Sequence, residues 1–298
     1  MPYSKFVNSL SRGLLILECF TPKQHYFSLS ELSKNTHISK STAFRILKTL
    51  CEMNYLKYDS QNKKYYLGAK VLSLGFSVLQ SMEIREIARP YIEKLSRECN
   101  KTANLAILDK HEMVYIERVK VQGLRNFNIS IGNRIPVWNT AVGKAVLAHL
   151  EEEPLNEIIK ELKELPECNI SGKKLLKELD EVRQDGYAVN DQEYLRGVRA
   201  VAVPVFSPNG VTCAINIVVE PEEVSMIELR NIYAPKLIKL GKELSEALGF
   251  QPEFIRGRDQ RTTPSNIPKE VERVCKRTNG DVNPVAAVQK FSKMTRRK

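Results

Sequence analysis

Polar and basic side chains recur along one short predicted helix, residues 40–53, in a pattern that suits nucleic-acid contact. The guanidinium of Arg45 can donate two parallel hydrogen bonds to a guanine edge, or it can bind a phosphate. Ser41 and Thr42 lie in the first turn, the part of such a helix that usually enters the major groove of DNA. A solvated helix face is the alternative, and we favour DNA contact because of the neighbouring elements. The predicted contacts on this helix are Lys40, Ser41, Thr42, Arg45 and Lys48.

Two short helices joined by a tight turn would position those side chains, after an amphipathic helix over residues 7–20. Ser28 and Glu31 have the spacing of a capping box, which would open a helix that reaches about residue 35. Ser39 can cap the helix at 40–53. Its predicted apolar stripe is Phe44, Leu47, Leu50 and Cys51. Two capped helices with such a turn are the helix-turn-helix signature.

A hairpin is predicted directly after these helices. Residues 55–58 and 64–68 alternate as strands do, and the turn-rich residues 59–63 separate them. Lys63 and Lys64 would stand on this hairpin, where phosphate or minor-groove contact is expected. Surface solubility also explains either lysine alone. Together the elements predict a winged helix-turn-helix.

The net charge of +11 is concentrated at the two ends of the 298-residue chain. Residues 1–68 hold 10 Lys and Arg against 4 Asp and Glu, and residues 251–298 hold 12 against 5. The residues between them are nearly neutral. Two localised basic segments indicate a polyanionic partner, most often a nucleic acid.

Helices and strands mix in the rest of the chain, so the fold class expected is α+β with an antiparallel sheet. Turn residues at 109–112 and 207–210 predict hairpins. The predicted strands are 103–108, 113–119, 126–131, 198–206 and 211–219. The predicted helices are 69–82, 84–99, 139–150, 154–164, 171–185 and 223–248.

These elements divide the chain into four expected parts. Residues 1–68 form the winged helix-turn-helix, 69–83 a linker helix, and 84–250 an effector-binding domain. Residues 251–298 lose all periodicity and are expected to be a basic, disordered tail with one weak helix at 267–276. One DNA-binding module covers one half-site, so a homo-oligomer is expected, with Leu72, Leu79 and Met82 contributing to self-association.

Catalytic, metal and membrane motifs are missing from the sequence. It has no G-x-S-x-G, H-E-x-x-H or dinucleotide fingerprint, and its four histidines have no evident nucleophile partner. None of the six cysteines forms a C-x-x-C pair, which favours reduced, mostly buried thiols. No apolar run approaches a membrane span, and no signal peptide is evident. We therefore expect a cytoplasmic protein that is not an enzyme, with no cofactor, metal or membrane partner.

Residues 140–144 carry small side chains at the start of a predicted helix. Such a helix start can receive an anion on its free N–H groups. Close packing of the helix is an equally good explanation. Asn190 follows on a predicted loop, as part of a pocket wall or of plain surface.

Three stretches in this order resemble the IclR family, named for the isocitrate lyase regulator, across residues 5–250. The first comprises Ser11-Arg12-Gly13-Leu14-Leu15-Ile16-Leu17, Leu29-Ser30-Glu31-Leu32 and Ser39-Lys40-Ser41-Thr42-Ala43-Phe44-Arg45-Ile46-Leu47. The second is Gly132-Asn133-Arg134-Ile135-Pro136-Val137-Trp138-Asn139-Thr140-Ala141-Val142-Gly143-Lys144-Ala145. The third is Gly186-Tyr187-Ala188, Glu193 and Gly197-Val198-Arg199-Ala200-Val201-Ala202-Val203-Pro204-Val205-Phe206.

The resemblance implies a GAF-like domain that binds a small-molecule effector, often a carboxylate or aromatic acid. It also implies a homodimer or homotetramer that binds palindromic double-stranded DNA operators. In the family the ligand lies against the sheet, near the small-residue helix start. The effector-binding residues expected from it are Ala141, Val142, Asn190, Ala200, Ile217 and Val219.

Some family members carry hydroxyl residues late in the last strand, at positions matched here to Ile217 and Val219. Aliphatic residues there favour an effector with an apolar or aromatic body and one anionic end, with Trp138 as a further contact to the body. The alternative is that Ile217 and Val219 belong to the core and the pocket lies elsewhere.

The leading hypothesis is a DNA-binding transcriptional regulator controlled by such an effector. One alternative is a small-molecule enzyme with an accessory nucleic-acid module. Another is an RNA-binding protein led by the basic tail, which the absence of RNP-like and GXXG motifs disfavours.

Overall fold

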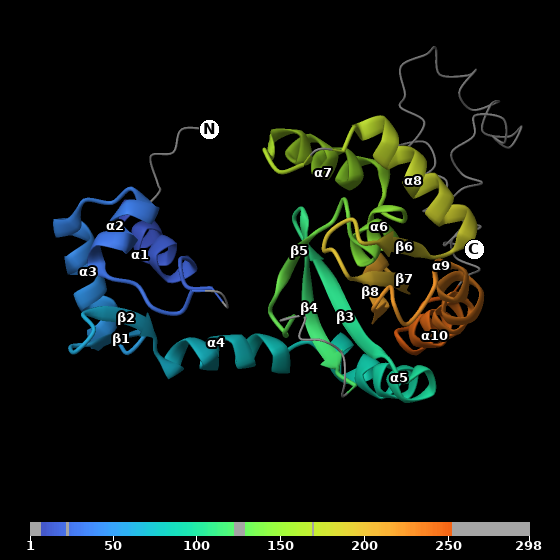
Figure 1. Cartoon of the computed structure of the whole chain (residues 1–298), viewed down its shortest axis with the longest axis horizontal. Coiled ribbons are helices and arrows are strands. Elements are labelled where there is room, and N and C mark those ends of the chain that lie inside the picture. The colour runs from blue at the N-terminus through green and yellow to red at the C-terminus, as the bar shows by residue number, and fades with distance from the viewer. Residues whose placement is uncertain (1–6, 22–23, 122–128, 169, 252–298) are drawn as a thin grey trace, which may run out of the picture. The chain divides into compact units, whose positions relative to one another are not determined.

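A small winged helix-turn-helix occupies the N-terminal part of the protein (Figure 1). The computed structural model describes residues 7–21, 24–121, 129–168 and 170–251. Three helices and an antiparallel hairpin surround a core that includes Ile16, Leu32 and Leu47, as the sequence predicted. The elements are α1 (Asn8–Glu18), α2 (Leu29–Thr36), α3 (Lys40–Glu52), β1 (Leu56–Asp59) and β2 (Lys64–Leu67).

Both predicted helix caps are confirmed. The N–H of Glu31 donates to Ser28 Oγ at 3.3 Å, and the N–H of Ser28 donates back to the Glu31 carboxylate at 2.7 Å. At α3 the N–H of Thr42 donates to Ser39 Oγ at 3.4 Å. These bonds satisfy N–H groups that a helix start leaves without partners, so they fix where each helix begins.

Helix α4 (Ala69–Gln80) follows the hairpin and has no buried residue. Its first turn is tied to the winged helix, because Lys70 Nζ donates to the Met53 carbonyl at 3.2 Å. Past its middle, Leu79 and then Met82 pack against the core beneath α5 (Glu83–Cys99). Both side chains remain partly exposed, so their contribution to self-association stays a prediction.

A six-stranded antiparallel sheet forms the centre of the C-terminal part, in the order β5-β4-β3-β8-β7-β6. The predicted antiparallel sheet is confirmed, and so are the hairpin turns at Asp109–Glu112 and Ser207–Gly210. The strands are β3 (Thr102–Asp109), β4 (Glu112–Val119), β5 (Arg134–Pro136), β6 (Ala188–Asp191), β7 (Arg199–Ser207) and β8 (Gly210–Val219).

Helices cover both faces of this sheet and make two separate hydrophobic cores. One face, called the α6 face, carries Ala106, Ala202 and Ala214. It packs against α6 (Ala141–Leu147), and α7 (Glu152–Glu164) and α8 (Gly172–Asp185) extend the same core. The opposite face, called the α5 face, packs against α5, α9 (Met226–Glu228), η1 (Leu229–Tyr233) and α10 (Ala234–Ala247).

Four elements differ from their predictions. Strand β6 includes Asn190, which was expected on a loop, and β5 lies where no strand was predicted. The predicted strand 126–131 lies mostly outside the described residues, and its described part, 129–131, is not a strand. The predicted helix 223–248 is interrupted by the π-helical turn η1, next to Pro235, whose nitrogen cannot donate to a helical bond. The tail beyond residue 251 lies outside the described residues.

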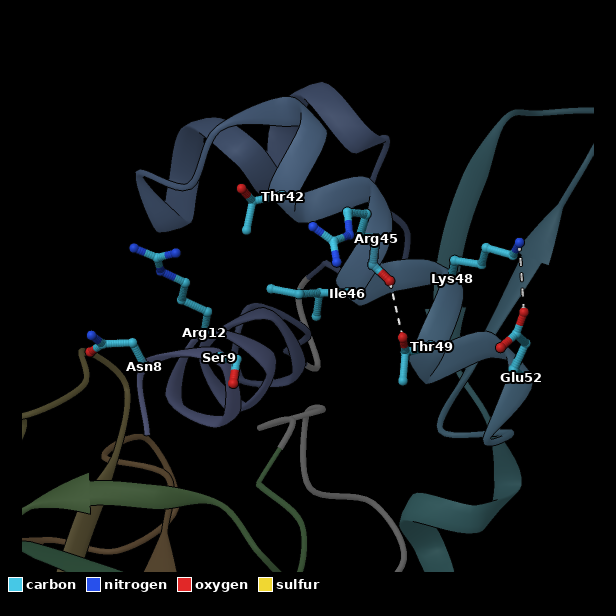
Figure 2. A pocket seen from close by; sticks show the side chains of 9 residues that line it. All are labelled: Asn8, Ser9, Arg12, Thr42, Arg45, Ile46, Lys48, Thr49 and Glu52. Atoms are coloured by element: carbon cyan, nitrogen blue, oxygen red, sulfur yellow. Dashed lines mark hydrogen bonds and ion pairs between the residues drawn. The ribbon is translucent and has the colours of Figure 1, made fainter. Parts of the chain in front are cut away.

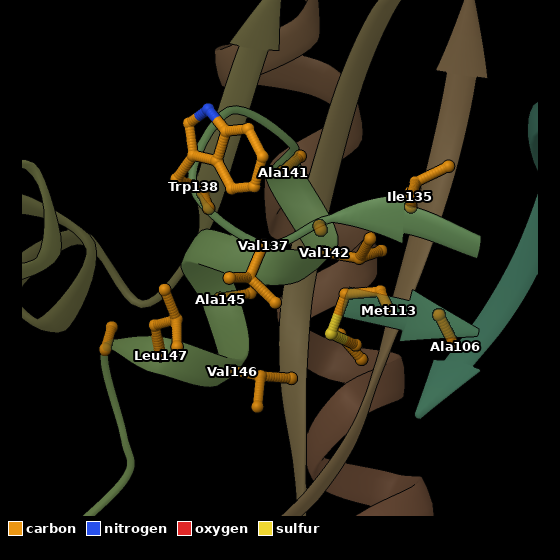
Figure 3. Close-up of a cluster of buried hydrophobic side chains, with 14 of the residues drawn as sticks. Ala106, Met113, Ile135, Val137, Trp138, Ala141, Val142, Ala145, Val146 and Leu147 are labelled. Carbon is orange, nitrogen blue, oxygen red and sulfur yellow. The ribbon is translucent and has the colours of Figure 1, made fainter. Parts of the chain in front are cut away.

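Helix α6 lies unusually close to its preceding segment (Figure 3). A Cβ added at Gly143 would lie 2.2 Å from the Val137 carbonyl oxygen. The alanines of the α6 face leave room for this helix, because they project only a methyl group from the sheet. Small side chains on both partners thus place the start of α6 directly on the strands.

Candidate DNA-contact face and ligand cavity

The exposed side of α3 presents most of the residues predicted to contact DNA. Lys40, Ser41, Arg45 and Lys48 are exposed. Thr42 is partly buried, and its Oγ1 accepts a hydrogen bond from Ser39 Oγ at 2.9 Å, so it also belongs to the cap. The capped start of α3 therefore holds two serine or threonine hydroxyls beside a row of cations.

A cleft of about 730 Å³ runs between α1 and α3, and it joins these residues to one that the sequence analysis did not select (Figure 2). Arg12 reaches the cleft from α1, and Arg45 and Lys48 reach it from α3. Arg12 was overlooked because α1 was considered only for its apolar stripe. Glu52 also lines the cleft, with its Oε1 3.9 Å from Lys48 Nζ, so three cations against one carboxylate leave a positive surface suited to phosphate groups.

Phe44 corrects the predicted core of α3. It is 52% exposed, whereas Ala43 and Leu47 fill the buried positions. The helical repeat places Phe44 on the same side as Lys40 and Lys48, each four residues away. An exposed phenyl ring there is placed to contact a thymine methyl group.

The hairpin presents the two remaining predicted cations. Lys63 is exposed with a left-handed backbone, φ 53°, and Lys64 is partly buried. Asp59 Oδ1 accepts from the N–H of Gln61 at 2.9 Å and from that of Asn62 at 3.2 Å. These bonds shape the turn that carries Lys63.

A second, smaller cavity opens on the α6 face and contains four of the six predicted effector residues: Ala141, Val142, Asn190 and Ala200. Its volume is about 30 Å³, enough for water alone. The other residues that line it were not among the predicted effector contacts. They are Tyr115, Ile129, Ile135, Thr140, Tyr194, Leu195, Val198, Asn216 and Val218.

Ile217 and Val219 lie on the wrong side of the sheet for this cavity, so their assignment is corrected. Both are buried in the core on the α5 face. Because side chains alternate along a strand, Asn216 and Val218 face the cavity instead. Ile217 and Val219 share one face of β8, and α5 and α10 cover that face. Trp138 is buried on the α6 face and does not line the cavity (Figure 3).

Polar side chains line one part of the cavity. Thr140 Oγ1 donates to the Pro136 carbonyl at 2.6 Å, and Asn190 Nδ2 donates to the Asn139 carbonyl. Burial raises the pKa of Tyr115 to about 12, so its hydroxyl is protonated at neutral pH. Asn216 Oδ1 accepts from Asn104 Nδ2 at 2.9 Å.

The start of α6 offers little to an anion. Gly143 donates its N–H to Thr140 Oγ1 at 3.3 Å, and its missing side chain is explained by the close approach of Val137. Lys144 is buried, and its Nζ lies 2.9 Å from a Glu178 oxygen and 2.6 Å from a Glu193 oxygen. Close packing thus accounts for the small residues of this segment.

Within the described part of the chain, no group of three or more His, Cys, Asp and Glu side chains is placed to hold a metal ion. The five described cysteines are free thiols, of which Cys99 and Cys213 are buried. Cys19, Cys51 and Cys168 are only partly buried, so the expectation of mostly buried thiols is wrong for these three. None of the described helices is both long and apolar enough to cross a membrane.

Comparison with known proteins matches both parts of the chain. Residues 9–60 match the IclR helix-turn-helix domain, and residues 76–246 match the C-terminal domain of IclR bacterial transcriptional regulators. The HTH-type transcriptional regulator XynR of Escherichia coli is 35% identical over 248 residues, covering 82% of this chain and 98% of that protein.

Solved structures agree with these matches. An IclR family transcriptional regulator from Brucella abortus has a TM-score of 0.73 at 29% identity, covering 83% of this chain and 94% of that one. An IclR homolog from Microbacterium hydrocarbonoxydans, solved in complex with 4-hydroxybenzoate, shares the fold. Its TM-score is 0.66 at 20% identity, covering 81% of this chain and 99% of that one. The chain therefore belongs to the IclR family, whose members are DNA-binding, effector-responsive transcriptional regulators rather than enzymes.

Proposed function

We propose that this regulator reads its operator through the exposed side of α3 and holds DNA phosphates in the cleft between α1 and α3. The observation that carries the proposal is the placement of Arg12, Arg45 and Lys48 on one cleft, beside a capped helix start. Arg45 supplies a base contact, Phe44 a thymine contact, and Arg12 with Lys48 the phosphate contacts. Lys40, Ser41, Thr42, Lys63 and Lys64 complete the proposed DNA-binding set.

Selection of duplexes from a random pool by the purified protein tests this function. We expect enrichment of a palindromic or pseudo-palindromic site, because a symmetric oligomer presents two equivalent recognition helices. Competition with RNA of the same composition should leave the selected duplex bound. Failure to enrich any sequence would contradict the proposal.

We propose that the chain has the domain organisation predicted from its sequence. Residues 1–68 bind DNA, 69–83 connect, 84–250 bind the effector, and 251–298 add positive charge. The separation of the core around Ile16 from the two cores that flank the sheet supports the first boundary. A regulator of this kind acts in the cytoplasm, where its DNA lies.

We further propose that two copies associate through α4, as a homodimer or within a homotetramer. Leu72 and Phe76, one helical turn apart, are 61% and 53% exposed. Leu74 and Val78 form a second exposed apolar stripe nearly opposite them, because two residues rotate a helix by about 200°. A short helix with apolar groups on both sides needs a partner to cover them.

Replacing both Leu72 and Phe76 with glutamate should convert the oligomer to a monomer at micromolar concentration, because four charges would enter the interface of a dimer. Sedimentation velocity measures the change. Leu176→Glu is the matched control, since Leu176 is also an exposed leucine on a helix, α8. A monomeric parent protein that still binds its operator tightly would contradict the proposal.

The cavity on the α6 face is the proposed effector site, and an acid with an apolar or aromatic body is the proposed effector class. Aliphatic side chains and two tyrosines line most of it, and the relative from Microbacterium hydrocarbonoxydans was solved with 4-hydroxybenzoate. A cavity of about 30 Å³ must widen to admit such a molecule. The partly exposed side chains of Tyr194 and Leu195 are the ones free to move outward.

Ala200→Leu should weaken the binding of aromatic acids about tenfold or more, because the larger side chain fills the cavity. Calorimetry with a panel of aromatic, longer-chain and two- or three-carbon oxo acids measures the change. Ile217→Val is the control: on the α5 face it should cost about 1 kcal/mol of stability and leave affinity unchanged. Selective tight binding of the smallest oxo acids would contradict the effector class.

A further inference from the structure

One cation on the α6 face has no partner among the described residues. Arg118 lies on β4, and its Nη1 is buried without a hydrogen-bond acceptor. None of the ion pairs found in the described residues includes Arg118. Burial lowers the pKa of its guanidinium, which reflects the cost of holding a charge away from water. Arg118 as a whole is only partly buried, but a buried donor atom without an acceptor is costly, so this position needs an explanation.

The sheet register places Arg118 beside the polar part of the cavity. Arg118 pairs with Asn104 of β3, and Asn104 pairs with Asn216 of β8. Residues paired across neighbouring strands project from the same face, so the three side chains form one row. Asn216 lines the cavity, and Tyr115, which also lines it, interacts electrostatically with Arg118.

The nearest carboxylate along the chain does not neutralise Arg118, because it faces the other way. Glu117 pairs with Leu105, which is buried on the α5 face, and its Oε2 lies 2.9 Å from Arg85 Nη2. Asn104 Oδ1 is also buried without a partner. The row therefore offers unsatisfied guanidinium N–H donors that adjoin a cavity lined by a neutral tyrosine and an amide.

We propose that Arg118 binds the anionic group of the effector, with Tyr115 and Asn216 as neutral hydrogen-bonding neighbours. This inference rests on the proposal that the cavity is the effector site. The proposed position of the effector's anionic group is away from the start of α6, where Lys144 already pairs with Glu178 and Glu193. The effector would then lie with its anion toward β3 and β4 and its apolar body toward Val142 and Val198.

Benzoate and benzamide, at millimolar concentration, are the probes for this contact, because they have the same shape and differ in charge. We expect benzoate to raise the unfolding temperature of the parent protein more than benzamide. Arg118→Met should lower benzoate affinity about 10- to 100-fold, as expected for hydrogen bonds to a charged group. Arg118→Lys should recover part of that affinity.

Stability without ligand separates this role from a structural one. Arg118→Met removes a partly buried charge that has no counter-ion among the described residues, so its unfolding temperature should equal or exceed that of the parent protein. Arg85→Met is the matched control. It should lower the unfolding temperature, because it breaks the pair with Glu117, and it should keep the preference for benzoate.

Equal effects of benzoate and benzamide on the parent protein would overturn the inference. So would an unchanged benzoate affinity in Arg118→Met, or a clear loss of stability in that variant. If Ala200→Leu abolishes benzoate binding and Arg118→Met does not, the cavity remains the effector site and Arg118 is not its anion contact. If Arg118→Met abolishes it and Ala200→Leu does not, the cavity is not the effector site, and the inference fails with it.

Discussion

Gly143→Ala should destabilise the effector-binding domain by about 3 kcal/mol or more, which places it among the most damaging single-methyl changes in the chain. The added Cβ would lie 2.2 Å from the Val137 carbonyl oxygen and 2.4 Å from the Val137 Cα. Both are backbone atoms, so no side chain can rotate away to relieve the overlap. Helix α6 or the segment before it must shift, and several residues of that segment line the cavity. Chemical denaturation measures the loss.

Gly75→Ala is the matched control for this substitution. Gly75 also lies inside a helix, α4, but an added Cβ would meet nothing within 4 Å. Alanine there should stabilise the protein by up to about 1 kcal/mol, because glycine is a poor helix former. Equal stability of the Gly143→Ala variant and the parent protein would show that α6 does not need this close approach.

Arg45→Ala should weaken binding to the selected operator by about 1–3 kcal/mol, or roughly 5- to 150-fold, while nonspecific binding changes little. A bidentate contact to guanine gives this difference, because a phosphate contact would contribute equally on every sequence. Fluorescence anisotropy with operator and scrambled duplexes measures both affinities. The Arg45 side chain is exposed and has no hydrogen-bond or ion-pair partner among the described residues, so the variant should fold normally.

Lys64→Ala provides the contrast for Arg45→Ala. A phosphate contact there predicts a similar loss on operator and scrambled duplexes. It also predicts a salt dependence that is shallower by about one unit of log–log slope. If Arg45→Ala also weakens binding to both duplexes equally and makes the salt dependence shallower, Arg45 binds phosphate and does not contact a base.

The winged helix was predictable because local rules determine most of it. Ser28, Glu31 and Ser39 cap their helices within four residues of sequence, and the hairpin turn is shaped by Asp59. The exposed position of Phe44 was not predictable in the same way. An apolar residue at helical spacing suits a core, and only the packing of the other helices shows that Phe44 lies outside it.

The residues of the cavity were harder to predict, because the sequence pattern does not say which face of each strand lines it. Alternation along a strand puts Ile217 and Val219 on one face, but alternation alone cannot say which face meets α6. Arg118 shows a further difficulty. A bulge at Ile116 inserts one extra residue opposite Leu105 and Ala106, so Tyr115 and Arg118 project from the same face although they are three positions apart. Strict alternation would place them on opposite faces.

The exposed middle of α4 has a consequence for how the protein transmits a signal. The helix is tied at Lys70 to the winged helix and at Leu79 to the effector-binding domain, and nothing buried holds the residues between. A 12-residue helix that contains a glycine is only marginally stable in water without packing. In a single copy, therefore, α4 is too weakly held to pass a change in the effector-binding domain on to the winged helix. Association through α4 would stiffen it, so coupling between the effector and the operator becomes a property of the assembled regulator and not of one chain.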